Sequence, residues 1–367
     1  MNIGICVIAF NRIESLKRVL NSLSRAYYNE DVSLIISIDK SDSTEVGKYA
    51  DNFDWKFGIK KIIKHPINLG LRKHVLKCGD LLEDFDALVV LEDDVSVAPS
   101  FYFYAKQCVE KYYNDDNVAG ISLYNFPFNY HTQMPFYPMP ADSDIYLMQC
   151  AQSWGEIWMR PAWKSFKLWY DNHNEEFGDM PHLPHSICHW PKSSWLKYHT
   201  KYCIEQNKYF IYPYISLSTN NSDIGTHSKS NNSLPQSIML YGKKEIFKLT
   251  PQVKYDAFFE SEMIADLLGI KKTDLCIDVY GEKKNREKKR YWLTMSCQPY
   301  KIVSSYGLCQ KTYEWNIINN IKGDDIFLYD TNIQSPKPKR NIHERLNLLK
   351  YFYKIQGLRN VFMKKLI

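Results

Sequence analysis

The stretch ALVVLEDDV at residues 87–95 decides the fold class of this chain. Residues 87–91 are an unbroken apolar run, which is typical of a strand buried on both faces in a parallel sheet. The run ends abruptly in Glu92, Asp93 and Asp94. Open α/β sheets bind ligands beyond the carboxyl ends of their strands, so this edge is the first candidate for a functional site.

Strands and helices alternate on both sides of this stretch. The apolar run from Ile3 to Phe10 predicts a first strand, and apolar residues at helical spacing between Leu16 and Leu23 predict a helix after it. Further strands are expected at 32–39, 59–63 and 118–122, with helices at about 71–82 and 101–113. This alternation predicts an α/β fold over residues 1–125, with a Rossmann-like mixed, mainly parallel sheet flanked by helices.

The rest of the chain is less regular. Proline and aromatic residues are frequent in 126–250, so we expect a loop-rich half that contains a strand at 210–216. Because loops often carry specificity, this half is expected to bind the acceptor substrate. Residues 251–367 are expected to form a C-terminal helical extension. In it, 331–340 has the composition of a linker and 342–367 predicts a basic amphipathic helix.

Composition indicates a folded globular protein. The 367 residues are 45% apolar and 24% charged, and the net charge of +6 is too small to indicate nucleic-acid binding. Nine cysteines without a C-x-x-C pair favour reduced thiols and a cytoplasmic location over disulfides or a zinc ribbon. The short N-terminal apolar run does not resemble a signal peptide, and no segment has the roughly 18 apolar residues of a membrane span. The motifs of P-loop kinases and serine hydrolases are absent from the sequence.

The acidic triplet indicates a cation. Three adjacent carboxylates repel one another unless a positive charge neutralises them. Mg²⁺ and Mn²⁺ prefer oxygen ligands and share their remaining positions with substrate phosphates. The alternative is a solvated acidic turn.

The motif LEDDV, followed by APSF at 98–101, resembles the metal-binding DXD region of GT-A glycosyltransferases. It is most similar to the N-acetylglucosaminyltransferase I type, glycosyltransferase family 13, and to bacterial family-2-like relatives. The resemblance implies a GT-A fold that uses Mn²⁺ or Mg²⁺. It also implies that Asp94 is the metal ligand and that Glu92 and Asp93 contact the nucleotide.

Three earlier segments extend the resemblance. The turn after the first strand matches the family's opening segment around the nucleotide and comprises Phe10, Asn11 and Arg12. Asp39, at a strand end, can accept the imide N–H of uracil, which favours a UDP-sugar, although aspartate there is equally a turn former. The glycine turn that opens the next helix is suited to a diphosphate and comprises Asn68, Gly70, Arg72 and Lys73.

Two later segments complete the candidate site. The loop with Trp154 resembles the tryptophan-glycine loop under the sugar, and Glu156 is the candidate base that deprotonates the acceptor hydroxyl. The family's following acidic segment has no counterpart here, so Asp179 is the second candidate base. His227 ends a Gly-x-His loop that implies a second metal ligand. A surface glutamate and an uninvolved loop histidine are the alternatives.

Together, these features predict a hexosyl- or N-acetylhexosaminyltransferase. It would move a sugar from a UDP-linked donor to a glycan or lipid-linked glycan, with inversion, in bacterial surface polysaccharide synthesis. The basic C-terminal helix would give peripheral contact with the cytoplasmic membrane, and no nucleic acid is expected as a partner. The alternatives are a nucleotidyltransferase for sugar phosphates and a non-catalytic basic protein that binds membrane or nucleic acid.

Overall fold

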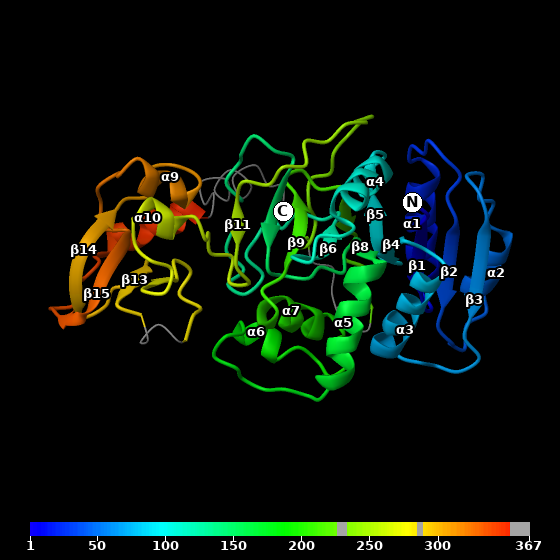
Figure 1. The fold of residues 1–367 in the computed structure, drawn as a ribbon, viewed down its shortest axis with the longest axis horizontal. Helices are drawn as coiled ribbons and strands as arrows, with labels where there is room; N and C mark the ends of the chain where they lie inside the picture. The colour runs from blue at the N-terminus through cyan, green and yellow to red at the C-terminus, as the bar shows by residue number, and fades with distance from the viewer. Residues whose placement is uncertain (226–232, 285–288, 353–367) are drawn as a thin grey trace, which may run out of the picture. The chain divides into compact units, whose positions relative to one another are not determined.

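The computed structural model describes residues 1–225, 233–284 and 289–352, and the chain divides into two compact units (Figure 1). The first unit comprises Met1–Pro127, Pro140–Gly178 and Ile187–Gln252. The second comprises Phe128–Met139, Asp179–Ser186 and the described part of 253–367. Each unit buries an apolar core of its own.

A mixed, mainly parallel sheet forms the centre of the first unit, in the order β7-β9-β6-β8-β4-β1-β2-β3 (Figure 1). Strands β4, β1, β2 and β3 run parallel, as do β6 and β9, whereas β8 is antiparallel to β4 and β6, and β7 to β9. The strands are β1 Ile3–Ala9, β2 Leu34–Ile38, β3 Lys60–Lys64, β4 Ala87–Glu92, β6 Val118–Ser122, β7 Ile145–Met148, β8 Glu156–Met159 and β9 Tyr209–Pro213. The predicted α/β class, with its mainly parallel sheet, is confirmed.

Helices flank this sheet because each carries an apolar stripe. Their bounds are α1 Ile13–Ser24, α2 Glu45–Asn52, α3 Leu71–Cys78, the 3₁₀ turn η1 Gly79–Glu83, α4 Phe101–Tyr112, α5 Arg160–Asn172 and α7 Leu196–Glu205. The stripe of α1, which includes Leu16 and Leu20, packs in one cluster with Val7 of β1 and Phe101 of α4. On the other face of β1, Gly4 lies against the ring of Phe85. Strand β1 is therefore covered on both faces, as its apolar run predicted.

A two-stranded ribbon lies beside the main sheet. It pairs β5, Val95–Val97, antiparallel with β10, Ser218–Asn220. Since β5 follows the acidic triplet almost directly, this pairing brings the 218–225 segment to the end of β4.

The strands and helices predicted in residues 1–125 are present within a few residues of their expected bounds. The middle of the chain is more regular than the expected loop-rich half, because α5 and α7 are helices of 13 and 10 residues. The short helix α6, His185–Cys188, lies where the chain passes from the second unit to the first. None of the described helices is long and apolar enough to cross a membrane.

The second unit contains a four-stranded sheet in the order β12-β13-β15-β14 (Figure 1). Strands β12 and β13 are parallel and the other pairs antiparallel. Residues Ile264, Leu293, Ile326 and Leu328 are central to its core. The elements are β11 Lys254–Tyr255, α8 Ile264–Leu267, β12 Leu275–Ile277, β13 Tyr291–Thr294, β14 Tyr300–Tyr306, α9 Tyr313–Ile318, β15 Ile326–Gln334 and α10 Ile342–Phe352.

This sheet corrects the expectation of a purely helical C-terminal extension. The helical part holds for α10, and residues 353–367 of the predicted helix lie outside the described residues. The expected linker at 331–340 is partly wrong, because β15 continues to Gln334. Strand β14 has only one buried residue, and its exposed residues include the apolar Ile302 and Val303, so its sequence lacks the alternation of period two that identifies a strand.

Gly79 provides a test of packing in the first unit. A Cβ added at this residue would lie 2.2 Å from the Trp163 ring of α5. We expect Gly79→Ala to lower the free energy of unfolding by ~1–3 kcal/mol through overpacking, measured by urea denaturation. Gly178→Ala is the control, since no atom lies within 4 Å of its added Cβ. Equal stability of the two variants would contradict this packing.

Candidate functional site

The carboxyl ends of β1 and β4 place the first turn beside the acidic triplet. The two strands are parallel neighbours with Ile8 opposite Glu92, so both chains leave the sheet at the same edge. Arg12 forms ion pairs with Asp93 through Nη2 and with Asp94 through Nη1, the latter at 3.2 Å. The turn between is partly exposed, with Phe10 half-buried and Asn11 exposed.

Burial and neighbouring charges shift the pKa values of Arg12 and of the acidic triplet. Burial, with the charges of Asp94 and Asp93, raises the pKa of Glu92 to about 8. Burial also raises the pKa of Asp93 to about 6, although Arg12 partly offsets it. Burial alone would lower the pKa of Arg12, but the two aspartates raise it above its ordinary value. The guanidinium therefore stays charged and offsets part of the negative charge of the triplet.

Asp94 has a buried oxygen without a partner. Its Oδ2 accepts from Arg12, whereas Oδ1 has no hydrogen-bond partner among the residues that the structure describes. An orphaned carboxylate oxygen in a buried site costs free energy unless a donor or cation reaches it. Carboxylate oxygens are hard ligands, so this atom fits the Mg²⁺ or Mn²⁺ that the sequence implied.

The loop after β10 closes against this group. The backbone N–H and Nδ2 of Asn221 both donate to the carbonyl of Asp94, at 2.8 and 3.0 Å. Asp223 accepts from Ser15 Oγ at 2.6 Å and forms an ion pair with Arg18, both on α1. Next to it, Gly225 packs so closely that an added Cβ would lie 2.9 Å from Arg12. The predicted metal ligand His227 lies outside the described residues.

Sequence reasoning missed Asn221 and Asp223 as site residues. The stretch that contains them was selected only for the histidine at its end. Asn221 lies 127 residues after Asp94 in the chain, so no local spacing connects them. The polar composition of the stretch was the only signal in the sequence. The pairing of β5 with β10 is what brings this stretch to Asp94.

Asp39 is occupied by its own chain. Its Oδ1 accepts from the N–H of Leu69 at 2.8 Å and its Oδ2 from that of Gly70 at 2.9 Å. Gly70 has a φ of +74°, a conformation that glycine adopts without strain. Asn68 donates to the carbonyl of Lys40 at 2.8 Å and completes this turn. Asp39 therefore holds the glycine turn, and this role argues against its predicted contact with uracil.

The two basic residues of the glycine turn differ. Arg72 donates to the Tyr170 hydroxyl at 2.7 Å and to the Asn174 carbonyl at 2.8 Å, and its guanidinium lies 4.2 Å from the centre of the Tyr198 ring. These contacts direct it toward α5 and α7. Lys73 is exposed at the start of α3. Lys73 is therefore the more accessible of the two predicted phosphate contacts.

The tryptophan loop lies beside the ribbon. Ser218 of β10 donates to the carbonyl of Trp154 at 2.6 Å, and the Trp154 ring meets Tyr124 edge-on at 5.0 Å. Gly155 has a φ of +95°, and a Cβ there would lie 2.9 Å from Ser218. The loop is therefore attached to the same ribbon that carries the segment against Asp94.

Glu156 is fully buried in β8, and neither carboxyl oxygen has a hydrogen-bond partner among the described residues. Burial raises its pKa well above the ordinary value, and the charge of Glu92 raises it further. Burial therefore favours the protonated form of the carboxyl. A raised pKa and complete burial do not suit the general base that the sequence predicts, and Glu156 stays a proposal in that role.

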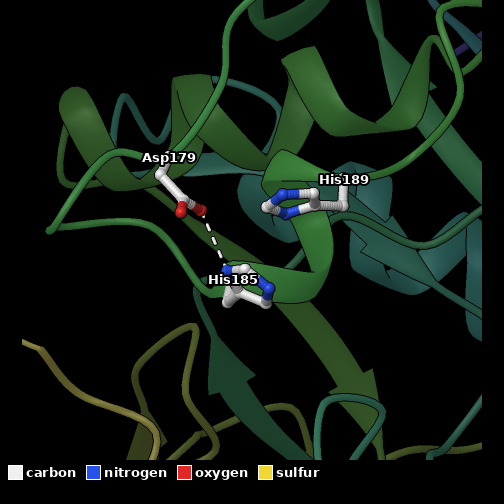
Figure 2. Close-up of side chains that lie close together, drawn as sticks. All are labelled: Asp179, His185 and His189. Atoms are coloured by element: carbon white, nitrogen blue, oxygen red, sulfur yellow. Dashed lines mark hydrogen bonds and ion pairs between the residues drawn. The ribbon is translucent and has the colours of Figure 1, made fainter.

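Asp179 belongs to the second unit and is exposed. Figure 2 shows the hydrogen bond from His185 Nδ1 to its carboxylate, at 2.9 Å. Lys284 lies 3.4 Å from the other oxygen. Although partial desolvation raises it, the hydrogen bond from His185 and the charge of Lys284 lower the pKa of Asp179 overall. Asp179 is ionised at neutral pH, as a base must be.

No family model and no curated protein matches this chain. Among solved structures it is similar to S. aureus TarS 1-349, at 11% identity over 60% of this chain and 61% of that one, with a TM-score of 0.40. It is similar to the mannosyltransferase PcManGT from Pyrobaculum calidifontis in complex with GDP-Man and Mn²⁺, at 10% identity, 58% and 57% coverage and a TM-score of 0.36. A third is GalNAc-T7 with UDP, GalNAc and Mn²⁺, at 12% identity, 58% and 43% coverage and a TM-score of 0.39. The chain spans about three fifths or less of the length of these proteins.

The buried state of Glu156 predicts a pH effect on stability. The folded chain keeps a proton that the unfolded chain loses above pH ~4.3, so native stability falls as pH rises, by up to about 1.4 kcal/mol per pH unit. We expect Glu156→Gln to remove this loss, so that its stability gain over the native chain grows between pH 5 and pH 8. Urea midpoints at each pH measure it. The exposed Glu175→Gln is the control, and parallel pH profiles for all three proteins would contradict the assignment.

Proposed function

We propose that this chain is a metal-dependent glycosyltransferase of the GT-A type that uses a UDP-linked nucleotide-sugar donor. The observation that carries the proposal is the meeting of Arg12, Asp93 and Asp94 at the carboxyl ends of β1 and β4. The loop with Asn221 is fastened to the same group. Carboxylates that could bind a cation and a positively charged arginine thus lie together at one edge of a parallel sheet. Open α/β folds bind nucleotides at this edge.

Asp94 is the proposed ligand of Mn²⁺ or Mg²⁺, because its Oδ1 is buried without a partner among the described residues. His227 remains a proposed second ligand. When bound, such a cation neutralises the charge of a leaving diphosphate. Arg12, which balances Asp93 and Asp94 without the cation, can then turn toward the diphosphate oxygens, since guanidinium binds phosphate well.

The donor is proposed to lie along the turn after β1. Phe10 and Asn11 would contact the nucleotide, and exposed Lys73 would add charge for its phosphates. Glu92 is half-buried and its pKa is raised. In its protonated form, Glu92 can donate a hydrogen bond to the nucleotide sugar. Asp39, Asn68 and Gly70 support the site through the turn they build, and Trp154 would line the sugar.

In the proposed transfer, the acceptor hydroxyl oxygen bonds to the anomeric carbon as the bond from that carbon to the diphosphate breaks, which inverts the configuration. The hydroxyl proton passes to a carboxylate. Glu156 and Asp179 are the two proposed bases: burial raises the pKa of Glu156, whereas the pKa of Asp179, which belongs to the second unit, is lowered. Residues 126–250 would bind the acceptor, with 1–125 binding the donor. The transferred unit is proposed to be a hexose or N-acetylhexosamine.

The acceptor is proposed to be a glycan or lipid-linked glycan in bacterial surface polysaccharide synthesis. Helix α10 supports contact with the cytoplasmic face of a membrane. Its Ile342, Leu346 and Leu349 are exposed, beside Arg345 and Lys350. Apolar and basic side chains on one exposed helix favour binding to anionic lipid.

The donor site is tested by calorimetry of UDP, GDP and UDP-sugars with and without Mn²⁺. We expect UDP to bind only with the metal, and Asp94→Ala to abolish this binding because it removes the cation ligand. Asp54→Ala, which removes an exposed aspartate of the same unit, is the control. If no nucleotide binds under any metal condition, the glycosyltransferase proposal fails and the basic binding-protein alternative replaces it.

Arg12→Gln separates metal binding from nucleotide binding. Without the competing guanidinium, Mn²⁺ alone should bind more tightly, measured by electron paramagnetic resonance of free Mn²⁺. UDP with Mn²⁺ should bind about tenfold more weakly, because a charge-assisted contact is lost. The exposed Arg25→Gln should change neither affinity. Loss of both affinities together in Arg12→Gln would refute the exchange of partners.

A further inference from the structure

The second unit contains a cavity of about 360 Å³ whose lining includes neither the proposed donor residues nor either proposed base. This volume is at the lower end of the range for small-molecule sites, ~300–1,000 Å³. Its chemistry is set by six side chains: His182, Asp256, Glu262, Lys272, Lys283 and Lys289. All six belong to the same unit.

Positive charge exceeds negative charge in this cavity. Lys283 forms an ion pair with Asp256, and Lys272 lies 3.4 Å from Glu262. Lys289 donates to the carbonyl of Lys272 at 2.8 Å, which uses one of its three donors. Lys289 is not paired with a carboxylate in that contact. The three lysines and two carboxylates of the described lining therefore leave one excess positive charge.

Lys283 is held in place by a rigid turn. The backbone N–H of Lys283 donates to Asp278 at 2.9 Å, and that of Tyr280 donates to buried Glu260 at 2.9 Å. Burial would lower the pKa of Lys283, but Asp256 and Glu260 raise it above its ordinary value. The ammonium group is therefore charged and fixed before any ligand arrives.

Apolar side chains form much of the rest of the described lining. Phe258 is buried with its ring centre 5.3 Å from Lys283 Nζ, and Leu275 and Ala265 lie beside the same cavity. Apolar walls with a few placed polar groups are typical of small-molecule sites. Asp256 and Glu262 can accept hydroxyl hydrogen bonds from a ligand that also contacts these walls.

We propose that this cavity binds a phosphorylated saccharide. Three of its lining side chains are lysines, which bind phosphate as point charges, whereas planar carboxylates are matched by the arginine fork. The two carboxylates would accept sugar hydroxyls while the phosphate contacts Lys272 and Lys289. A divalent cation is disfavoured, because both carboxylates already face ammonium groups.

Calorimetry with glucose 1-phosphate on the full chain tests this proposal, in the intact protein and in Asp94→Ala. Glucose 1-phosphate should bind both proteins equally, because the cavity and Asp94 belong to different units. Inorganic phosphate and glucose should each bind at least about tenfold more weakly. Lys272→Gln and Lys283→Gln should each weaken glucose 1-phosphate about tenfold.

Lys271→Gln is the matched control, since Lys271 is exposed and does not line the cavity. It should leave the affinity unchanged. Lys272→Gln alters only an exposed side chain, so it remains informative if Lys283→Gln does not fold. Four outcomes would overturn the proposal: no binding, equal binding of inorganic phosphate, equal weakening by Lys271→Gln, or loss of binding in Asp94→Ala. The last would assign the sugar phosphate to the donor site instead.

Discussion

The ion pairs of Arg12 with Asp93 and Asp94 fix the geometry at the edge of the first sheet. Two parallel strands end side by side, and one of them ends in three acids that repel one another. Arg12 offsets this repulsion from the neighbouring strand and so joins the two turns. The later loop is attached to the same edge by other contacts, because Asn221 donates to the backbone carbonyl of Asp94 and Asp223 accepts from Ser15 of α1.

A further acidic side chain, Glu156, lies near this ion-paired group. Glu156 in β8 is opposite Val90 of β4, and the charge of Glu92 raises its pKa. Burial raises the pKa of Glu156 and so favours its neutral form, which limits the negative charge near the triplet. Asp94 differs from Glu156 in carrying one oxygen that accepts from Arg12 and one that has no partner among the described residues.

The sequence was informative where burial is symmetric. Strands β1 and β4 are apolar on both faces, so their apolar runs identify them as strands even when the neighbouring strands are unknown. Strand β14 has only one buried residue, and the sheet of the second unit escaped prediction. In the site, Arg12 and the triplet were selected from the family resemblance, and they lie together because their strands are parallel neighbours. Asn221 was not selected, since only the long-range pairing of β5 and β10 joins it to Asp94. Asp39 was chosen for its position, but local backbone donors already occupy it.

The two units differ in the charge balance of their polar clusters. In the first unit, a single arginine faces two aspartates, and one aspartate oxygen has no partner among the described residues, which is why a cation is proposed there. In the described lining of the second unit's cavity, three lysines stand against two carboxylates, which is why an anion is proposed there. Each excess of charge is small, because the paired groups cancel most of it, so each proposed site would discriminate by the sign and position of one unbalanced group. Since each unit has its own core, a substitution in one charge cluster leaves the packing that supports the other intact.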